Sequence, residues 1–393
     1  MKFRFNKNLF SGYLLAGLPI LFSVWTVSII ARDLGVKGRG EIVVLTLFAA
    51  LWGTASGLGI PWASRELGTS KFSIDQLWWR ATLFISALMT IASILIGLSV
   101  FGTSHEHLIP ILIILILNSL TSVRTFQAAM IMQKYGTWIN SVLGIIAQLI
   151  FVVSIELFDH FGVLTISWVL LFQAVTLLVP IAGGAVITKK IEIPVPRKST
   201  FDLEHSKVLL DAFFRQAKDA LLSKIDILLL VLVSTSYRGI GLYSIAGVLF
   251  QLSYQITNQA LYSSYSELMA PLVRLRYALW RSLIPVFTIC FFAILTSNLW
   301  MPVLFGVEFL AAQTLLIPVT VGCIGLTIWI LTNALNQRQG HYVFPIQIIF
   351  SIGAVFMIQT IGNSLEITVW GIGVILLLIA SHDLFRMLRK YEL

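Results

Sequence analysis

The sequence predicts an all-α integral membrane protein with 12 transmembrane helices in two pseudo-symmetric six-helix lobes around a central cavity. Three observations lead to this prediction. Of the 393 residues, 58% are hydrophobic and only 11% are charged, and the mean hydropathy is +0.90. Stretches of about 20 apolar residues recur between short polar breaks, as expected for helices that cross a bilayer. Short motifs also recur at a nearly constant offset along the chain.

The 12 predicted spans follow from these apolar stretches. The first is longer than the hydrophobic part of a secretory signal and lacks a small-residue cleavage site, so we expect it to be retained. The spans are 11–31, 41–61, 79–101, 109–132, 137–157, 163–187, 209–233, 240–263, 279–299, 310–334, 342–362 and 367–386.

Basic residues predict the orientation. With both termini in the cytoplasm, 19 of the 27 Lys and Arg residues lie on the inner side, and only Arg32, Lys37, Arg39 and Arg238 lie outside. This asymmetry follows the positive-inside rule. It accounts for most of the formal net charge of +9 and therefore implies no nucleic-acid partner.

The longest polar connection, residues 189–207, separates a predicted N-terminal lobe (1–188) from a C-terminal lobe (208–393). We interpret this connection as a cytoplasmic linker because it contains two prolines and several basic residues.

Two motif pairs indicate that the lobes are related. Residues 37–40 (Lys-Gly-Arg-Gly) precede the second span, and residues 238–241 (Arg-Gly-Ile-Gly) lie 201 positions later, around the start of the eighth. Residues 133–136 and 337–340 follow the fourth and tenth spans, 204 positions apart. An even number of helices per lobe makes the repeats parallel, and a cavity between them follows.

The seventh span carries an unusual number of charges. Without its charged half, only residues 225–237 would remain to cross, and about 20 Å of helix cannot span a hydrocarbon core of about 30 Å. A stripe of both signs is too costly to face lipid, so we expect it to face a bundle interior or a wet cavity. The residues on this stripe are Asp211, Arg215, Lys218, Asp219 and Asp226.

The basic members of this stripe are candidate substrate ligands. Arg215 and Lys218, with Arg124 of the fourth span, could bind an anionic head group through charge-assisted hydrogen bonds. Internal pairing is the alternative, because Arg215 lies four residues from an aspartate on either side. The acidic members could couple transport to an ion; they are Asp211, Asp219 and Asp226. The alternative for Asp219 and Asp226 is structural pairing with Lys218 or Arg124.

Amide side chains mark the eighth span as a second candidate surface. Amides and a phenol offer the donors and acceptors that sugar hydroxyls require. Hydrogen bonding between helices is the alternative use of the same residue types. The residues that share this side are Ser244, Gln251, Gln255, Asn258, Gln259 and Tyr262, and four of them, Gln251, Gln255, Asn258 and Tyr262, are candidate substrate ligands.

Other chemistry is not indicated. The glycine-rich residues 35–40 connect two membrane helices, which favours a tight turn over a phosphate-binding loop. His105, Glu106 and His107 lack further ligands nearby, so we expect neither a metal site nor a cofactor. Cys290 and Cys323 lie in apolar stretches and are interpreted as packing residues.

Several motifs resemble one family. Residues 32–40, Arg-Asp-Leu-Gly-Val-Lys-Gly-Arg-Gly, resemble the R-x-L-G-x-x-G-x-G pattern of bacterial polysaccharide (O-antigen type) flippases, within the multidrug/oligosaccharidyl-lipid/polysaccharide exporter superfamily. Residues 225–226 (Ile-Asp), 241–246 (Gly-Leu-Tyr-Ser-Ile-Ala) and 304–309 (Leu-Phe-Gly-Val-Glu-Phe) are similar to the same family. The seventh span carries more charge than the family pattern has.

The resemblance implies a function. It implies translocation of an undecaprenyl-pyrophosphate-linked oligosaccharide from the cytoplasmic to the periplasmic leaflet of the bacterial inner membrane. It also implies polysaccharide polymerase and chain-length proteins as possible partners, beside the lipid bilayer itself.

Three alternatives remain. A drug/cation antiporter of the same superfamily would favour acidic cavity residues, whereas here three basic candidates balance three acidic ones. A polysaccharide polymerase or ligase would need a reaction centre on a large outer loop, yet each predicted outer loop has about ten residues or fewer. We therefore predict that the protein is not an enzyme. A scaffold role would leave the charged stripe of the seventh span unexplained.

Overall fold

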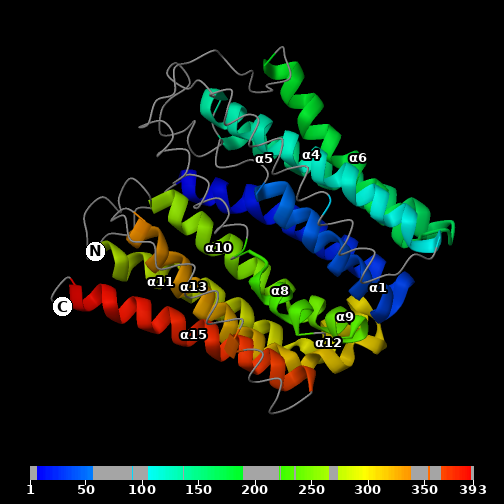
Figure 1. Cartoon of the computed structure of the whole chain (residues 1–393). Coiled ribbons are helices and arrows are strands. Elements are labelled where there is room, and N and C mark those ends of the chain that lie inside the picture. The colour runs from blue at the N-terminus through cyan, green and yellow to red at the C-terminus, as the bar shows by residue number, and fades with distance from the viewer. Residues whose placement is uncertain are drawn as a thin grey trace. The chain divides into compact units, whose positions relative to one another are not determined.

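The computed structural model describes residues 7–55, 91, 105–135, 137–188, 221, 223–233, 236–264, 273–337, 353–354 and 364–390. The regular elements in these residues are helices (Figure 1). Five of them are long and apolar enough to cross a membrane: Ile139–His160, Ile166–Ile187, Ala278–Leu295, Val307–Thr332 and Leu365–Arg389.

The chain separates into two compact units. The N-terminal unit comprises Leu21–Leu34 and Glu41–Lys224, and the C-terminal unit comprises Met1–Ile20, Gly35–Gly40 and Ile225–Leu393. The predicted linker, 189–207, lies outside the described residues, so the lobe boundaries taken from the sequence stay a prediction.

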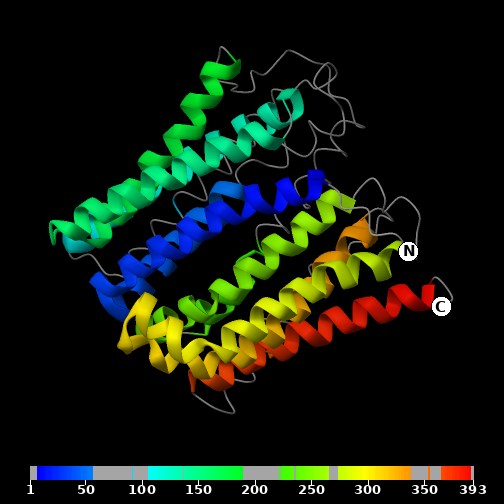
Figure 2. The same cartoon turned by 180° about the vertical axis from the view of Figure 1, so that it is seen from behind.

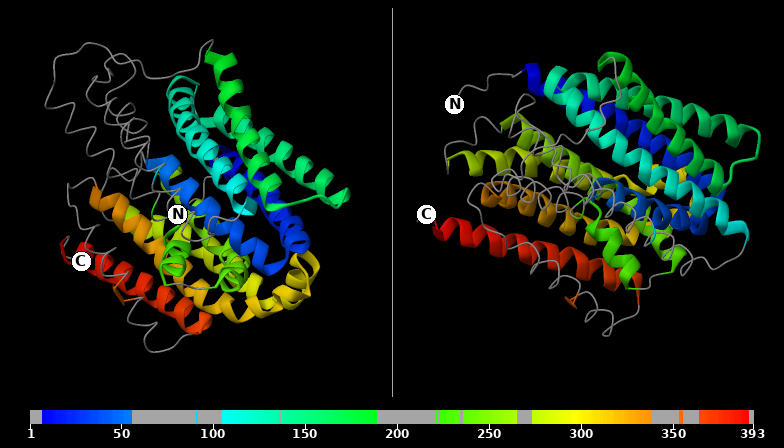
Figure 3. Two further views of the ribbon diagram at one scale, coloured as in Figure 1. Left: turned by 45° about the vertical axis from the view of Figure 1, so that its right-hand side comes forward. Right: turned by 45° about the horizontal axis from the view of Figure 1, so that its top comes forward.

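The N-terminal unit is built on long apolar helices. α4 (His105–Tyr135), α5 (Thr137–His160) and α6 (Ile166–Thr188) run side by side in every view (Figures 1, 2 and 3). α1 (Lys7–Ala55) contributes parts on both sides of Gly35. A cluster of aliphatic and aromatic side chains joins α1 to α5, α6 and the loop between them: Ile29, Ile30, Ile42, Phe151, Ile155, Leu164 and Val169.

Gly35 divides α1 into two helices. Its φ of 65° and ψ of −175° leave the helical region, and positive φ is readily accessible only to glycine. The turn predicted for this glycine-rich run is therefore confirmed at Gly35. Among the described glycines, positive φ occurs elsewhere only at Gly162 and Gly306, so Gly38 and Gly40 serve another purpose.

The C-terminal unit contains the remaining described helices. Ser236 caps α9, because its hydroxyl accepts a 3.2 Å hydrogen bond from the Gly239 amide. In chain order the elements are α8 (Ile225–Leu232), α9 (Tyr237–Ala246), α10 (Val248–Ser264), α11 (Val273–Leu295), α12 (Ser297–Phe305), the 3₁₀-helix η1 (Val307–Leu315), α13 (Leu316–Gln337) and α15 (Leu365–Lys390).

α13 is the centre of this unit and packs against α10, α11 and α15 (Figures 1 and 2). Glycines allow its close approach to α15. A Cβ on Gly325 would lie 2.6 Å from the Leu377 nitrogen, and one on Gly373 would lie 2.5 Å from the Pro318 carbonyl oxygen. Small residues at such contacts let membrane helices pack backbone to backbone.

The structure corrects two predicted spans. The seventh was expected to be one helix over 209–233, but the chain turns at Ser223 and Lys224 before α8 begins. The eighth was expected over 240–263, but it breaks at Gly247 into α9 and α10. The predicted spans 79–101 and 342–362 lie outside the described residues except at Ile91 and at 353–354.

Candidate functional site

The exposed face of α10 is the candidate site that the structure describes most completely. Gln251 and Gln255 are exposed and Asn258 is half-buried, and the spacing of four and three residues aligns them along one side of the helix. We call these three residues the amide stripe. The sequence prediction that these amides share a helix side therefore agrees with the structure.

The opposite face of α10 is buried within the C-terminal unit. Ser253, Thr257 and Ala260 are all at most 2% exposed. The Thr257 and Thr327 hydroxyl oxygens lie 3.2 Å apart and join α10 to α13. Packing and interhelical hydrogen bonding, the alternative uses of polar residues in membrane helices, thus fall on the face away from the amide stripe.

Because of the break at Gly247, one residue that the sequence grouped with the amide stripe lies on a different helix. Ser244 was grouped with these amides, but it lies on α9, is buried, and donates to the Gly241 carbonyl. Tyr262, a predicted ligand, lies in α10, and its side chain is outside the described residues, as is that of Gln259.

The buried carboxylate of Asp226 lies on α8 and is 2% exposed. The Tyr243 hydroxyl of α9 donates a 2.7 Å hydrogen bond to Asp226 Oδ2. The sequence suggested Lys218 or Arg124 as partners and did not suggest this phenol. Gly247 makes room for it, because a Cβ there would lie 3.1 Å from a Tyr243 ring carbon.

The other predicted charged residues lie on α4 and in the seventh predicted span. Arg124 lies on α4 of the N-terminal unit and is half-buried. It shares its helix with two buried polar side chains, Asn118 and Gln127. The remaining charged candidates of the seventh span lie outside the described residues: Asp211, Arg215, Lys218 and Asp219.

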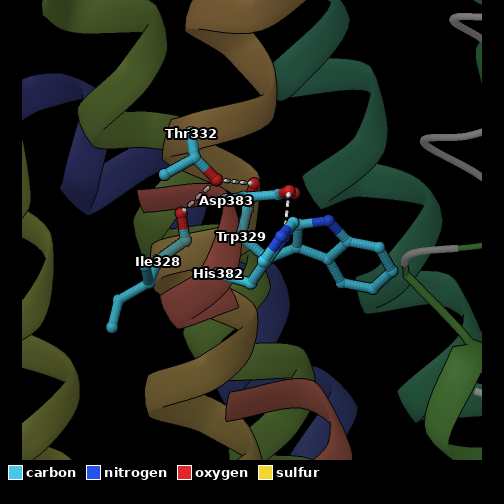
Figure 4. A network of polar contacts seen from close by, with 5 residues as sticks. All are labelled: Ile328, Trp329, Thr332, His382 and Asp383. Atoms are coloured by element: carbon cyan, nitrogen blue, oxygen red, sulfur yellow. Dashed lines mark hydrogen bonds and ion pairs between the residues drawn. The ribbon is translucent and has the colours of Figure 1, made fainter. Parts of the chain in front are cut away.

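A second buried carboxylate escaped the sequence reasoning. Asp383 on α15 is 4% exposed, and Nδ1 of the adjacent His382 lies 3.7 Å from its Oδ1 (Figure 4). On the facing helix α13, the Thr332 hydroxyl donates to the Ile328 and Trp329 carbonyls, each at 3.0 Å. The sequence did contain a signal for Asp383. An aspartate inside the predicted span 367–386 is costly to place in a membrane, and such residues are usually functional.

Neither metal nor disulfide chemistry appears in the described part of the chain. There, no group of three His, Cys, Asp or Glu side chains comes together as possible metal ligands. Cys290 and Cys323 are both buried free thiols, which agrees with their interpretation as packing residues.

Comparison with solved structures identifies the fold. An inward-facing multidrug resistance MATE family transporter of the MOP superfamily matches with a TM-score of 0.64 and 13% identity, over 95% of this chain and 94% of that one. The lipid II flippase MurJ, in an inward closed conformation, matches with a TM-score of 0.65 and 15% identity, over 98% and 88%.

A third match is a MOP superfamily transporter from Pyrococcus furiosus, reported with reversed polarity of its binding pocket. Its TM-score is 0.63 at 15% identity, over 96% of this chain and 95% of that one. No protein-family model and no curated protein matches the sequence.

These matches confirm the predicted fold class, an all-α membrane protein of 12 transmembrane helices in two six-helix lobes. They agree with the resemblance to the exporter superfamily, and the matched proteins are transporters and a flippase rather than enzymes. The chain is therefore a multi-pass membrane protein with the fold of the MOP superfamily transporters.

Proposed function

We propose that this protein is a flippase that moves an undecaprenyl-pyrophosphate-linked oligosaccharide, such as an O-antigen repeat unit, to the periplasmic leaflet of the bacterial inner membrane. Both termini lie in the cytoplasm in this proposal, as the distribution of basic residues indicates. Polysaccharide polymerase and chain-length proteins would act on the product.

The amide stripe is the observation that carries the proposal. Moving an amide from water into hydrocarbon costs about 4–8 kcal/mol when nothing satisfies its hydrogen bonds. Two exposed glutamines one turn apart, Gln251 and Gln255, are therefore poorly suited to face lipid tails. They suit a water-filled pathway, where amides can exchange hydrogen bonds between water and sugar hydroxyls.

Two further lines support a lipid-linked substrate. The motifs at residues 32–40 and 241–246 resemble polysaccharide flippases. One protein with the same fold is a lipid II flippase. The half-buried Arg124, with Arg215 and Lys218 from the sequence, supplies positive charge suited to a pyrophosphate.

In the proposed mechanism the two lobes alternate between openings to the cytoplasm and to the periplasm. Arg215 and Lys218 receive the pyrophosphate, the amide stripe contacts the sugars, and the polyprenyl tail stays in lipid. The sugars thereby cross without entering hydrocarbon, which removes the main energetic barrier to flipping.

A deletion strain tests this function. We expect a lipid-linked oligosaccharide to accumulate in the cytoplasmic leaflet and surface polysaccharide to be lost. Wild-type protein should restore export, and a Gln251→Leu/Gln255→Leu variant at equal abundance should export at least tenfold less. The matched control is Thr288→Val, an exposed polar-to-apolar change between exposed Phe287 and Ile289 on α11. Normal export in the deletion strain would overturn the proposal.

The buried carboxylates favour a second candidate, a drug/cation antiporter. Asp226 and Asp383 are both nearly inaccessible, and acidic groups inside a transporter can bind a cation or a proton. Several matched structures are multidrug transporters of the same fold. If this candidate is right, the deletion strain keeps its surface polysaccharide and becomes more sensitive to cationic drugs.

A further inference from the structure

Two glycine-containing helical turns of the C-terminal unit, one after Gly35 in α1 and one at the start of α9, meet with their backbones in contact. A Cβ on Gly40 would overlap the carbonyl oxygen of Tyr237, and one on Gly241 would overlap the carbonyl oxygen of Val36. Both glycines are buried. Neither position can accept a side chain unless the backbones separate. We call the contact of residues 36–40 with residues 237–241 the glycine crossing.

The glycine crossing is reciprocal. Val36 and Tyr237 are 201 positions apart in the sequence, and so are Gly40 and Gly241. Each segment therefore offers the other segment a carbonyl oxygen and, four residues later, a glycine. The carbonyl oxygen of each segment faces the glycine of the other. Such an exchange of roles is the signature of a two-fold contact between equivalent surfaces. It is the relationship expected of duplicated halves whose equivalent turns meet.

Side-chain contacts accompany the backbone contact at the glycine crossing. Arg39 Nε donates to the Ser244 hydroxyl oxygen at 3.3 Å. A Cβ on Gly35 would lie 3.6 Å from Glu308 Oε2, so the turn also approaches η1. A hydrogen bond from a charged donor contributes about 1.5–3 kcal/mol, and backbone contact between glycines adds little apolar area. Contacts of this kind can open and close reversibly.

The connectivity of the chain gives the crossing a mechanical role. Residues 35–40 belong to the C-terminal unit, whereas the helices on both sides, Leu21–Leu34 and the segment after Glu41, belong to the N-terminal unit. Those helices have their own core with α5 and α6, through Ile30 and Ile42. Residues 35–40 can thus leave the crossing while those helices keep their core with α5 and α6.

We propose that the glycine crossing is a latch at the periplasmic face that opens once in each transport cycle. The inference rests on the proposed function, because alternating access requires contacts on one face to break while those on the other face form. The latch closes through the paired backbones and the hydrogen bond of Arg39. It opens when residues 36–40 separate from residues 237–241.

Cross-linking tests the latch in the full-length protein. The variant Arg39→Cys/Ser244→Cys, in a Cys290→Ser/Cys323→Ser background, is treated with a short thiol-specific cross-linker in liposomes. We expect flipping of the lipid-linked oligosaccharide to fall at least tenfold and to recover after reduction. The matched control is Trp25→Cys/Glu156→Cys, which replaces a 3.0 Å contact inside the N-terminal unit and should flip normally when cross-linked.

Two results would overturn the latch. One is normal flipping by the cross-linked Arg39→Cys/Ser244→Cys protein. The other is failure of this pair to cross-link under conditions in which the control pair does. If the protein without cross-linker moves no lipid-linked oligosaccharide, the proposed function fails instead. In that case the latch is tested by adding Gln251→Cys to the Arg39→Cys/Ser244→Cys variant. Cross-linking of the pair must slow thiol labelling of Gln251→Cys from the periplasmic side at least tenfold.

Glycine variants provide a test without cysteines at the working positions. Gly40→Ala and Gly241→Ala each place a methyl group where a carbonyl oxygen now lies. Each should slow cross-linking of the Arg39→Cys/Ser244→Cys pair severalfold, because the turns must move apart. Gly144→Ala is the control, since nothing lies within 4 Å of its Cβ position. Unchanged cross-linking in both crossing variants would contradict the latch.

Discussion

The hydroxyl of Tyr243 donates a 2.7 Å hydrogen bond to Oδ2 of Asp226 and so joins α9 to α8 inside the C-terminal unit. Both side chains are at most 2% exposed. A buried carboxylate that loses a donor retains its desolvation cost, so this contact should matter for stability.

The change Tyr243→Phe tests that contact directly. The phenyl ring keeps the packing and removes the donor, which should lower the free energy of unfolding by about 1–3 kcal/mol. Thermal unfolding in detergent measures the loss. In the double variant Tyr243→Phe/Asp226→Asn the cost should be smaller than the sum of the single changes, because a neutral amide is less costly to leave underbonded. Additive costs would mean that the two side chains do not interact.

The change Gly247→Ala should weaken the same contact indirectly. Its methyl group would lie 3.1 Å from a ring carbon and from the carbonyl oxygen of Tyr243, so the ring must give by a few tenths of an ångström, which strains its hydrogen bond to Asp226. We expect a lower melting temperature than for Gly144→Ala, a glycine substitution into open space. In a Tyr243→Phe background the effect of Gly247→Ala should shrink, and an undiminished effect would count against this explanation.

Gly325→Ala should destabilise the contact of α13 with α15. The added Cβ would lie 2.6 Å from the Leu377 nitrogen and 2.8 Å from the Leu376 carbonyl carbon, and backbone cannot give way as a side chain can. Overpacking of this kind costs about 1–3 kcal/mol. Unfolding of purified protein in detergent measures it, and a variant as stable as wild type would show that the two helices separate easily.

Asp33 should make stability depend on pH. Partial burial raises the pKa of Asp33, and the charge of Asp159 raises it further. A raised pKa in the folded state means that the ionised side chain opposes folding at neutral pH, and that this cost disappears as pH falls through the raised pKa. Asp33→Asn should therefore raise the melting temperature at pH 7.

The advantage of Asp33→Asn should diminish on acidification and vanish below the ordinary aspartate pKa of about 3.9. Melting curves from pH 7 downwards measure this trend. A difference between variant and wild type that does not vary with pH would mean that ionisation of Asp33 is not its cause.

Much of the fold could be predicted because composition and span length are constrained by the bilayer. The predicted spans 137–157 and 163–187 correspond closely to α5 and α6. The break at Gly247 could not be foreseen, since an apolar stretch gives a similar hydropathy whether it forms one helix or two. The turn at Ser223 and Lys224 was missed because the span-length argument treated residues 209–233 as one continuous helix.

The candidate site was predictable in part. Helical spacing correctly aligned Gln251, Gln255 and Asn258, because their positions depend only on local geometry. The partner of Asp226 was not predictable, since Tyr243 approaches it through a tertiary contact that periodicity does not encode. Asp383 was missed although its position inside a span was visible in the sequence.

Thiol labelling of the amide stripe tests the central claim most directly. Gln251→Cys and Phe287→Cys are compared in membranes, in a Cys290→Ser/Cys323→Ser background; both wild-type side chains are exposed, one polar and one apolar. We predict that a membrane-impermeant reagent labels Gln251→Cys, that lipid-linked oligosaccharide slows this labelling, and that Phe287→Cys stays unreactive in lipid. Equal lack of reactivity at both positions would place the amide stripe in lipid and contradict the proposed pathway.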